Sequence, residues 1–308
     1  QFPDIQYSMN QRPPIWDLLN RRFVTLWVIS FSSGVFTAPV FSLLAIYIES
    51  VLQKPPIFSA TLRAALLVVG GFVAILGGAL CDSIGRKQTY LLGMTGGVLA
   101  GLLFISTTPS VLIVLCLYIG FCFGFLTTAS QSYMMDAVSS RSLGLGAAIY
   151  FIGNTLGNAT GNFILSPLAD TLGFRIMGWI IIIGMSALFF GTFFLLPGSW
   201  PNVAGSPQRS VRKMLAGYPD LLQRPLPLML MGLRFLPTCY WGAATLLIPL
   251  LIFRATGTST PAAHYSAVSL IVAACFQLVV GRFCDRFGRK RPVLIASFFV
   301  TLSALGTG

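Results

Sequence analysis

The sequence predicts an all-α membrane protein that crosses the bilayer many times, and three observations lead to that prediction. Hydrophobic residues make up 55% of the 308 residues and charged residues only 9%, whereas soluble domains carry roughly 25% charged residues. The mean hydropathy is +0.81. Apolar stretches of about 20 residues, the length that a helix needs to cross hydrocarbon, recur along the whole chain. A very apolar soluble core is the alternative, and this regular recurrence disfavours it.

The apolar stretches predict eight complete membrane helices and part of a ninth. They lie at residues 23–50, 60–81, 89–107, 110–135, 144–168, 175–196, 225–252 and 261–283, and the ninth starts near residue 293 and is cut by the chain end at Gly308. Turn chemistry separates several of them, at residues 54–56, 108–110, 196–198 and 256–261. Proline removes a backbone donor, and glycine and small hydroxyl residues favour turns.

A long polar segment divides these helices into two groups. We expect an N-terminal six-helix bundle at residues 1–196, a cytoplasmic linker at 197–224 and an incomplete C-terminal bundle, helices 7 to 9, at 225–308. Residues 211–215 of the linker are a candidate basic amphipathic helix on the membrane surface. A solvated linker without such a helix is the alternative.

Lysine and arginine are distributed unevenly between the two sets of loops. The formal net charge is +12. If the N-terminus is cytoplasmic, only Lys54, Arg63, Arg175 and Arg254 lie at outer ends, as the positive-inside rule requires. We therefore expect a multi-pass protein of the plasma (inner) membrane with a cytoplasmic N-terminus. The basic residues form no run interleaved with aromatics, so the expected partner is the lipid bilayer and not nucleic acid.

The reactive side chains predict neither a metal site nor an enzyme. The six cysteines lie within or at the edges of apolar stretches without metal-ligand spacing, and His264 is the single histidine. No nucleophile, base and orienting group occur together as catalysis would require. We expect no catalytic residue, no metal and no cofactor.

The most specific motif is a repeat of ten residues. Residues 78–87 (GALCDSIGRK) follow the second apolar stretch and residues 281–290 (GRFCDRFGRK) follow the eighth, so that six positions coincide without a gap. The first glycine of each copy permits close helix packing, the second permits a tight reversal, and the aspartate can accept hydrogen bonds from an arginine or a helix N-terminus. Such a loop can be a latch that forms in one state only; a loop that only fixes topology is the alternative.

The repeat resembles the signature loop between helices 2 and 3 of the major facilitator superfamily and its echo between helices 8 and 9. Residues 136–144 (DAVSSRSLG) resemble that family's loop between helices 4 and 5. The resemblance implies a fold of two six-helix bundles, here truncated within helix 9. The gating loops that it implies contain Gly78, Asp82, Gly85, Arg86, Lys87, Gly281, Asp285, Gly288, Arg289, Lys290, Asp136 and Arg141.

The same resemblance implies a secondary transporter that moves a small solute by alternating access. A non-transporting receptor or assembly factor on the same fold is the alternative. The fourth stretch lacks an embedded arginine, and Gly157-Asn158 stands where drug/proton antiporters of the family have Gly-Pro, which disfavours that exchange. We expect a monomer with a small-molecule substrate, and a proton or another ion as a candidate co-substrate.

Arg234 heads the candidate substrate-binding residues. It lies about nine residues into the seventh stretch, and a charge at such depth usually faces a cavity or a partner; snorkelling to the interface is the alternative. Thr238 and Trp241 share its helical face at i+4 and i+7. Together these three residues indicate an anionic or polar substrate.

The fourth and fifth stretches add three polar candidates. Asn154 and Asn158 follow glycines at four-residue spacing, which predicts either polar packing between helices or a polar cavity wall. Gln131 offers hydrogen-bonding groups in the fourth stretch, and ordinary hydrogen bonding between helices is the alternative to a role in substrate binding. Glu49 and Asp170 are the only acids at the outer ends of the stretches, so candidates for proton coupling are few.

Overall fold

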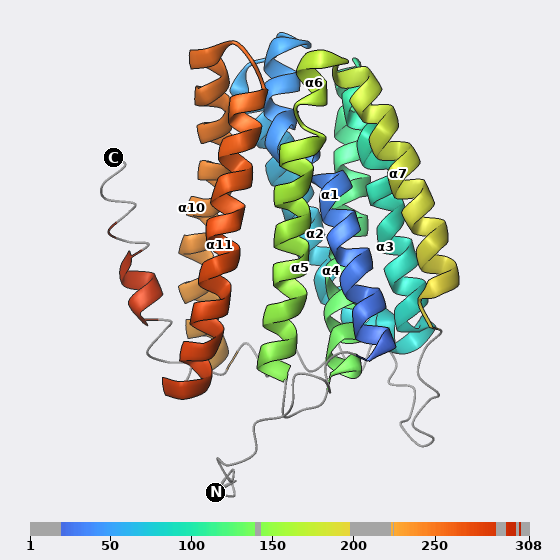
Figure 1. The fold of residues 1–308 in the computed structure, drawn as a ribbon, viewed down its shortest axis with the longest axis vertical. Helices are drawn as coiled ribbons and strands as arrows, with labels where there is room; N and C mark the ends of the chain where they lie inside the picture. The colour runs from blue at the N-terminus through green and yellow to red at the C-terminus, as the bar shows by residue number, and fades with distance from the viewer. Residues whose placement is uncertain are drawn as a thin grey trace, which may run out of the picture.

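The computed structural model describes residues 20–138, 143–197, 223, 225–287, 294–299 and 302. Its helices run along the long axis of the molecule, with α11 beside α5 and α10 next to α11 at one side, and α3 and α7 at the other (Figure 1). The elements are α1 (Arg21–Ser50), α2 (Pro56–Ile84), α3 (Arg86–Ala100), the 3-10 helix η2 (Gly101–Phe104), α4 (Pro109–Ala137), α5 (Leu143–Ile164), α6 (Leu168–Thr171), α7 (Phe174–Leu195), α10 (Pro225–Thr256) and α11 (Thr260–Phe287).

Local sequence signals set the helix ends. The side chain of Asn20 accepts a hydrogen bond from the backbone of Phe23 at 2.8 Å and so caps α1. Pro56 and Pro109 each occupy the first turn of a helix, where a missing N–H costs nothing. We call the end that carries the turns at residues 51–55 and 257–259 the distal end, and the end that carries Gly85 the proximal end.

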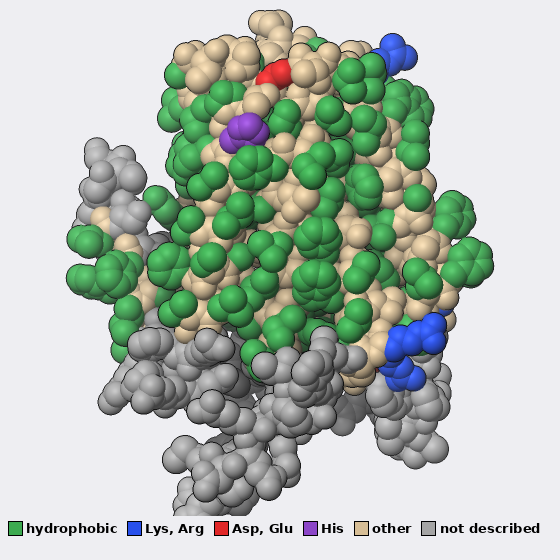
Figure 2. All heavy atoms as spheres, viewed as in Figure 1, with side chains coloured by type: hydrophobic (Ala, Val, Ile, Leu, Met, Phe, Trp, Pro, Cys, Tyr) green, Lys and Arg blue, Asp and Glu red, His purple; other side chains and the backbone are tan. Residues whose placement is uncertain are grey.

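Six helices within the described residues are long and apolar enough to cross a membrane: Arg21–Ser50, Pro56–Gly78, Pro109–Ala137, Phe174–Leu195, Met231–Thr256 and Thr260–Val280. α3 has only 15 residues, although η2 extends it directly. Figure 2 shows hydrophobic side chains across the middle of the visible face and charged side chains near its two ends. That band is the surface expected of a protein surrounded by lipid.

The buried core is divided along the long axis. The cluster at the distal end joins α1, α2, α4 and α7 to Leu250 of α10 and to Ala262 and Ala263 of α11. The cluster at the proximal end consists, among the described residues, of side chains from α1 to α5 and of Leu196 beyond α7. The α10–α11 pair therefore shares a hydrophobic core with the other helices at the distal end.

Candidate functional site

The proximal end brings two of the predicted gating residues into contact. Arg86, the first residue of α3, forms an ion pair with Asp136 in the last turn of α4. The same guanidinium donates from Nη1 to the backbone oxygen of Ser132 at 3.0 Å. The sequence indicated both charged residues as parts of gating loops, and the structure shows that they bind each other.

The turn between α2 and α3 explains why a glycine stands before Arg86. Gly85 has φ 99° and ψ 150°, a conformation that side-chain-bearing residues rarely adopt. The predicted tight reversal at Gly85 is confirmed. Lys87 then points to α7, where its Nζ donates to the backbone oxygen of Phe193 at 2.7 Å and lies 5.4 Å from the Phe193 ring centre.

The close helix packing that the sequence predicted at Gly78 occurs at the neighbouring Gly77 instead. No described atom lies within 4 Å of the position that a Cβ of Gly78 would occupy, whereas a Cβ on Gly77 would lie 3.0 Å from Thr128 of α4. The reason is the helical period, because consecutive residues point about 100° apart and only Gly77 faces α4.

Several of the predicted site residues are not tested by the structure. The backbones of Asp82, Arg234, Gly281 and Asp285 belong to α2, α10 and α11, but the placements of their side chains are not among those described. Arg141, Gly288, Arg289 and Lys290 lie outside the described residues, as do residues 211–215 of the linker.

The asparagines of α5 lie against α1. Asn158 donates from Nδ2 to the backbone oxygen of Asn154 at 2.9 Å, and Asn154 donates to the backbone oxygen of Ser30 at 3.4 Å. A Cβ on Gly157 would overlap the backbone oxygen of Phe31. Of the two readings of this stripe, the geometry favours polar packing between two closely spaced helices.

A carboxylate joins the two groups of helices at the distal end. Asp170 of α6 accepts hydrogen bonds from the backbone nitrogens of Ser259 and Thr260 at 2.9 and 2.7 Å, and from their hydroxyl groups at 2.7 and 2.6 Å. Ser259 directly precedes α11 and Thr260 is its first residue, so the carboxylate also lies at the positive end of a helix. We call this group, Asp170 with Ser259 and Thr260, the distal latch.

The electrostatics of the distal latch favour an ionised carboxylate. Partial burial by itself raises the pKa of Asp170, but the hydrogen bonds from Thr260 and Ser259 outweigh burial and lower the pKa below its ordinary value. Asp170 is therefore a poor proton carrier near neutral pH in this state, which argues against the coupling role that its position in the sequence suggested.

A second charged contact lies beside the distal latch. Arg254 near the end of α10 donates from Nε and Nη2 to the two carboxylate oxygens of Glu49 at 2.7 and 2.9 Å. The side chain of Arg254 is 49% exposed and that of Glu49 23% exposed. Because both groups remain partly hydrated, this bidentate pair orients α10 on α1 more than it stabilises the contact.

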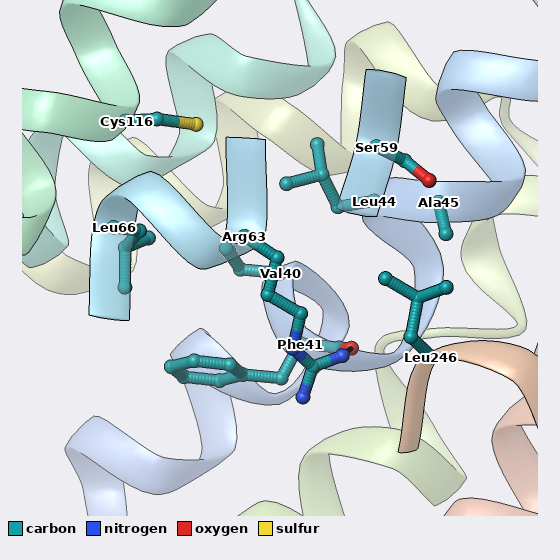
Figure 3. Close-up of a pocket in the computed structure, with 9 residues that line it drawn as sticks. All are labelled: Val40, Phe41, Leu44, Ala45, Ser59, Arg63, Leu66, Cys116 and Leu246. Atoms are coloured by element: carbon teal, nitrogen blue, oxygen red, sulfur yellow. Dashed lines mark hydrogen bonds between the residues drawn. The ribbon is translucent and has the colours of Figure 1, made fainter. Parts of the chain in front are cut away.

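Between these ends, a small pocket surrounds the side chain of Arg63 (Figure 3). Its walls come from α1, α2, α4 and α10 and are mostly apolar, with Val40, Leu44, Leu66, Cys116 and Leu246 among them. The cavity volume is about 20 Å³, which is room for about one water molecule. The pocket is therefore too small for a solute in this state.

The guanidinium of Arg63 reaches across to α10. Its Nη2 donates to Thr245 Oγ1 at 2.7 Å, its Nη1 lies 3.4 Å from the backbone oxygen of Phe41, and its Cζ lies 5.9 Å from the centre of a Trp241 ring. Trp241, which is itself exposed, thus lies next to a half-buried cation. Thr238 and Gln131 are exposed, and neither is among the residues that line this pocket.

These features are those of a multi-pass helical membrane protein with an arginine-containing pocket between two groups of helices. The family model described as "Major Facilitator Superfamily" matches residues 23–308. The chain belongs to this superfamily, as the repeat predicted, and membership of a transport family agrees with the expectation that it is not an enzyme.

The chain is also similar to two proteins that carry transporter names. It is 26% identical to an uncharacterized transporter of Buchnera aphidicola over 183 residues, which are 58% of this chain and 44% of that protein. The match thus spans less than half of the relative's length. The crystal structure of the nucleoside transporter NupG, a point mutant, superimposes with a TM-score of 0.67 at 15% identity, covering 87% of this chain and 69% of NupG.

Sequence reasoning missed Arg63 and the distal latch. It placed Arg63 at the outer end of a helix that it expected to begin at residue 60, but α2 begins at Pro56. The signal was present, because Pro55-Pro56 favours a helix start at the second proline. With that start, Arg63 lies two turns inside the helix.

Proposed function

We propose that this protein moves a small solute across the membrane by alternating access, and that the structure is the state closed at the distal end. The distal latch is the observation that supports this most directly. It joins α6 to the start of α11 through four hydrogen bonds to one carboxylate, and hydrogen bonds of this kind break and reform without loss of fold.

The other contacts between the two groups of helices support the same state. Glu49–Arg254 and Arg63–Thr245 both join the first helices to α10 in its distal half. Further from the distal end, α11 meets α5 through a longer bond, from Gln277 Nε2 to Thr155 Oγ1 at 3.4 Å. A rocking motion about the α5–α11 contact would open the distal end and close the other.

We place the two moving bodies at residues 1–196 and 225–308, joined by a linker at 197–224. In this proposal the repeated loops control the proximal end. The Arg86–Asp136 ion pair holds the α2–α3 turn on α4. The distal end faces out of the cell across the plasma (inner) membrane in this proposal, because only Lys54, Arg63, Arg175 and Arg254 of the lysines and arginines fall at the outer ends of the apolar stretches.

The experiment combines a screen for solute flux with a crosslink that holds the distal end closed. The purified full-length protein is reconstituted into vesicles and tested for counterflow of sugars, amino acids, organic anions and lipophilic cations. The substitutions Asp170→Cys and Thr260→Cys are then introduced into a protein without native cysteines, and the two new thiols are joined by a short crosslinker. Flux should stop when the pair is joined and continue in the same variant before crosslinking.

The control joins two positions that do not move apart in the proposal. Thr171→Cys and Arg175→Cys lie in α6 and α7 of the same group, so joining them should leave flux unchanged. Flux that continues when the distal latch is locked contradicts alternating access through this end. Absence of saturable flux for every solute, with an intact fold, would favour the receptor or assembly-factor alternative.

A further inference from the structure

The Arg63 side chain extends away from the distal end of the helices and not toward it. Its backbone lies seven residues after Pro56, about 10 Å from the distal start of α2. Its guanidinium bonds Thr245, which lies eleven residues before the distal end of α10 at Thr256, about 16 Å deep. A snorkelling arginine would do the opposite, because its side chain would extend to the interface.

No described carboxylate neutralises this cation. The acids whose side chains the structure describes are Glu49, Asp136 and Asp170, and each has a partner elsewhere. Asp82 follows Arg63 on α2 by 19 residues, about 28 Å along the helix axis, and cannot reach it. A charge at this depth normally faces a partner or a substrate path, and the protein side of this partnership consists of a hydroxyl, a carbonyl and an aromatic ring.

One edge of the Arg63 guanidinium is prepared for a carboxylate. The Nε–H is buried and has no hydrogen-bond partner, and the neighbouring Nη2 is bound only by the neutral hydroxyl of Thr245. Arg254 in the same structure uses the Nε and Nη2 edge to bind both oxygens of Glu49. At Arg63 the equivalent edge lacks its carboxylate, and an unsatisfied buried donor costs free energy.

The surroundings of the guanidinium restrict the rest of such a ligand. Figure 3 shows the Arg63 side chain between helices, with apolar neighbours such as Leu44, Leu66 and Leu246. Trp241 of α10 supplies an aromatic face beside it. These walls suit an apolar body, and a second charge on the ligand would find no partner among them.

We propose that Arg63 binds the carboxylate of an organic monoanion with an apolar body, and that this is the substrate class of the transporter. The inference rests on the proposed function. The ligand displaces Thr245 from Nη2 and takes both donors of the Nε–Nη2 edge when α10 moves away from α2. In the present state Thr245 binds Nη2 in the place of the ligand.

The test measures binding to the purified full-length protein at neutral pH by calorimetry. The probes are acetate, hexanoate and benzoate, each paired with its neutral amide, together with chloride and sulfate. Hexanoate or benzoate should bind, and their amides and the inorganic ions should bind at least tenfold more weakly. Equal binding of amide and acid, or no binding of any carboxylate, would overturn the proposal.

Variants assign the effect to the guanidinium. Arg63→Gln should weaken carboxylate binding at least tenfold and Arg63→Lys less, whereas Arg175→Gln, which removes an exposed distal arginine, should leave it unchanged. If Arg63→Gln does not fold, Thr245→Val decides, since removal of the competing hydroxyl should tighten binding severalfold. Unchanged binding in Thr245→Val would contradict the displacement.

The two proposals fail separately. If the distal latch opens and locking stops flux, but carboxylates do not bind, then the transport mechanism stands and this substrate class is wrong. If the distal end never opens, the transport mechanism is wrong whatever Arg63 binds.

Discussion

Replacement of Asp170 by asparagine tests the distal latch at its strongest contact. An amide keeps one acceptor oxygen and its NH2 group faces a backbone N–H, so that one of the two backbone hydrogen bonds from Ser259 and Thr260 is lost together with the negative charge at the start of α11. Hydrogen bonds to a charged group contribute roughly 1.5–3 kcal/mol each, but Asp170 is exposed and solvent screens part of that. We expect a loss of about 2 kcal/mol, or roughly 30-fold in the ratio of closed to open states.

Amide hydrogen exchange of residues 257–263 measures this change, because the backbone N–H groups of Ser259 and Thr260 themselves donate to Asp170. Exchange in this segment should rise by up to roughly 30-fold in Asp170→Asn. The control is Thr171→Ala, whose hydroxyl bonds only within α6. Equal exchange in Asp170→Asn and the unchanged protein would refute the view that this carboxylate holds the distal end closed.

The same segment gives a pH dependence of known sign. Asp170 has a lowered pKa in the closed state, so its stabilisation is fully present above the ordinary carboxyl value of about 3.9 and is lost as the pH falls through the lower, closed-state pKa. Protection of residues 257–263, corrected for intrinsic exchange, should therefore be constant from pH 8 to about pH 5. A loss of protection near pH 6 or 7 would mean that another group controls the latch.

Two further predictions concern other contacts between helices. Glu49→Gln should raise the amide exchange of residues 257–263 by fivefold or less, since a partly exposed ion pair contributes about 0–1 kcal/mol. The double variant Arg254→Glu with Glu49→Arg, which exchanges the two charges, should restore most of the protection. An effect of Glu49→Gln as large as that of Asp170→Asn would contradict this ranking. Gly157→Ala should destabilise the protein by about 1–3 kcal/mol, because the new methyl group overlaps the Phe31 backbone. The control Gly191→Ala places a methyl group that meets nothing within 4 Å and should leave the midpoint of thermal unfolding unchanged. Equal midpoints for the two variants would contradict the close α1–α5 contact.

The helices were largely predictable because hydrophobic length and turn residues act locally. The start of α1 and the end of α7 fall within two residues of the expected bounds. The fifth stretch was expected to continue to residue 168 but α5 ends at Ile164, and the separate α6 starts at Leu168. Pro167 explains the difference, because it has no backbone N–H to donate to the preceding turn of the helix. The residues around it are mostly apolar, so the hydrophobic pattern alone did not indicate the break.

The contacts of the site were much less predictable, because they depend on how distant helices meet. Arg63 and Thr245 are 182 residues apart, and no local pattern assigns one to the other. Arg86 and Asp136 were both expected in gating loops, yet the sequence suggested the aspartates of the repeat as partners for arginine. Trp241 was chosen for its spacing from Arg234, and in the structure its described cationic neighbour is Arg63.

The most direct test of the central claim is a distance across the distal end. Spin labels introduced through unnatural amino acids at Thr171 and Thr256, both exposed and in different groups of helices, report that distance in vesicles by pulsed electron spin resonance. We predict two populations, a short distance for the closed state and a longer one that grows in Asp170→Asn. A single short distance, unchanged in Asp170→Asn and in the presence of every solute tested, would contradict alternating access through this end.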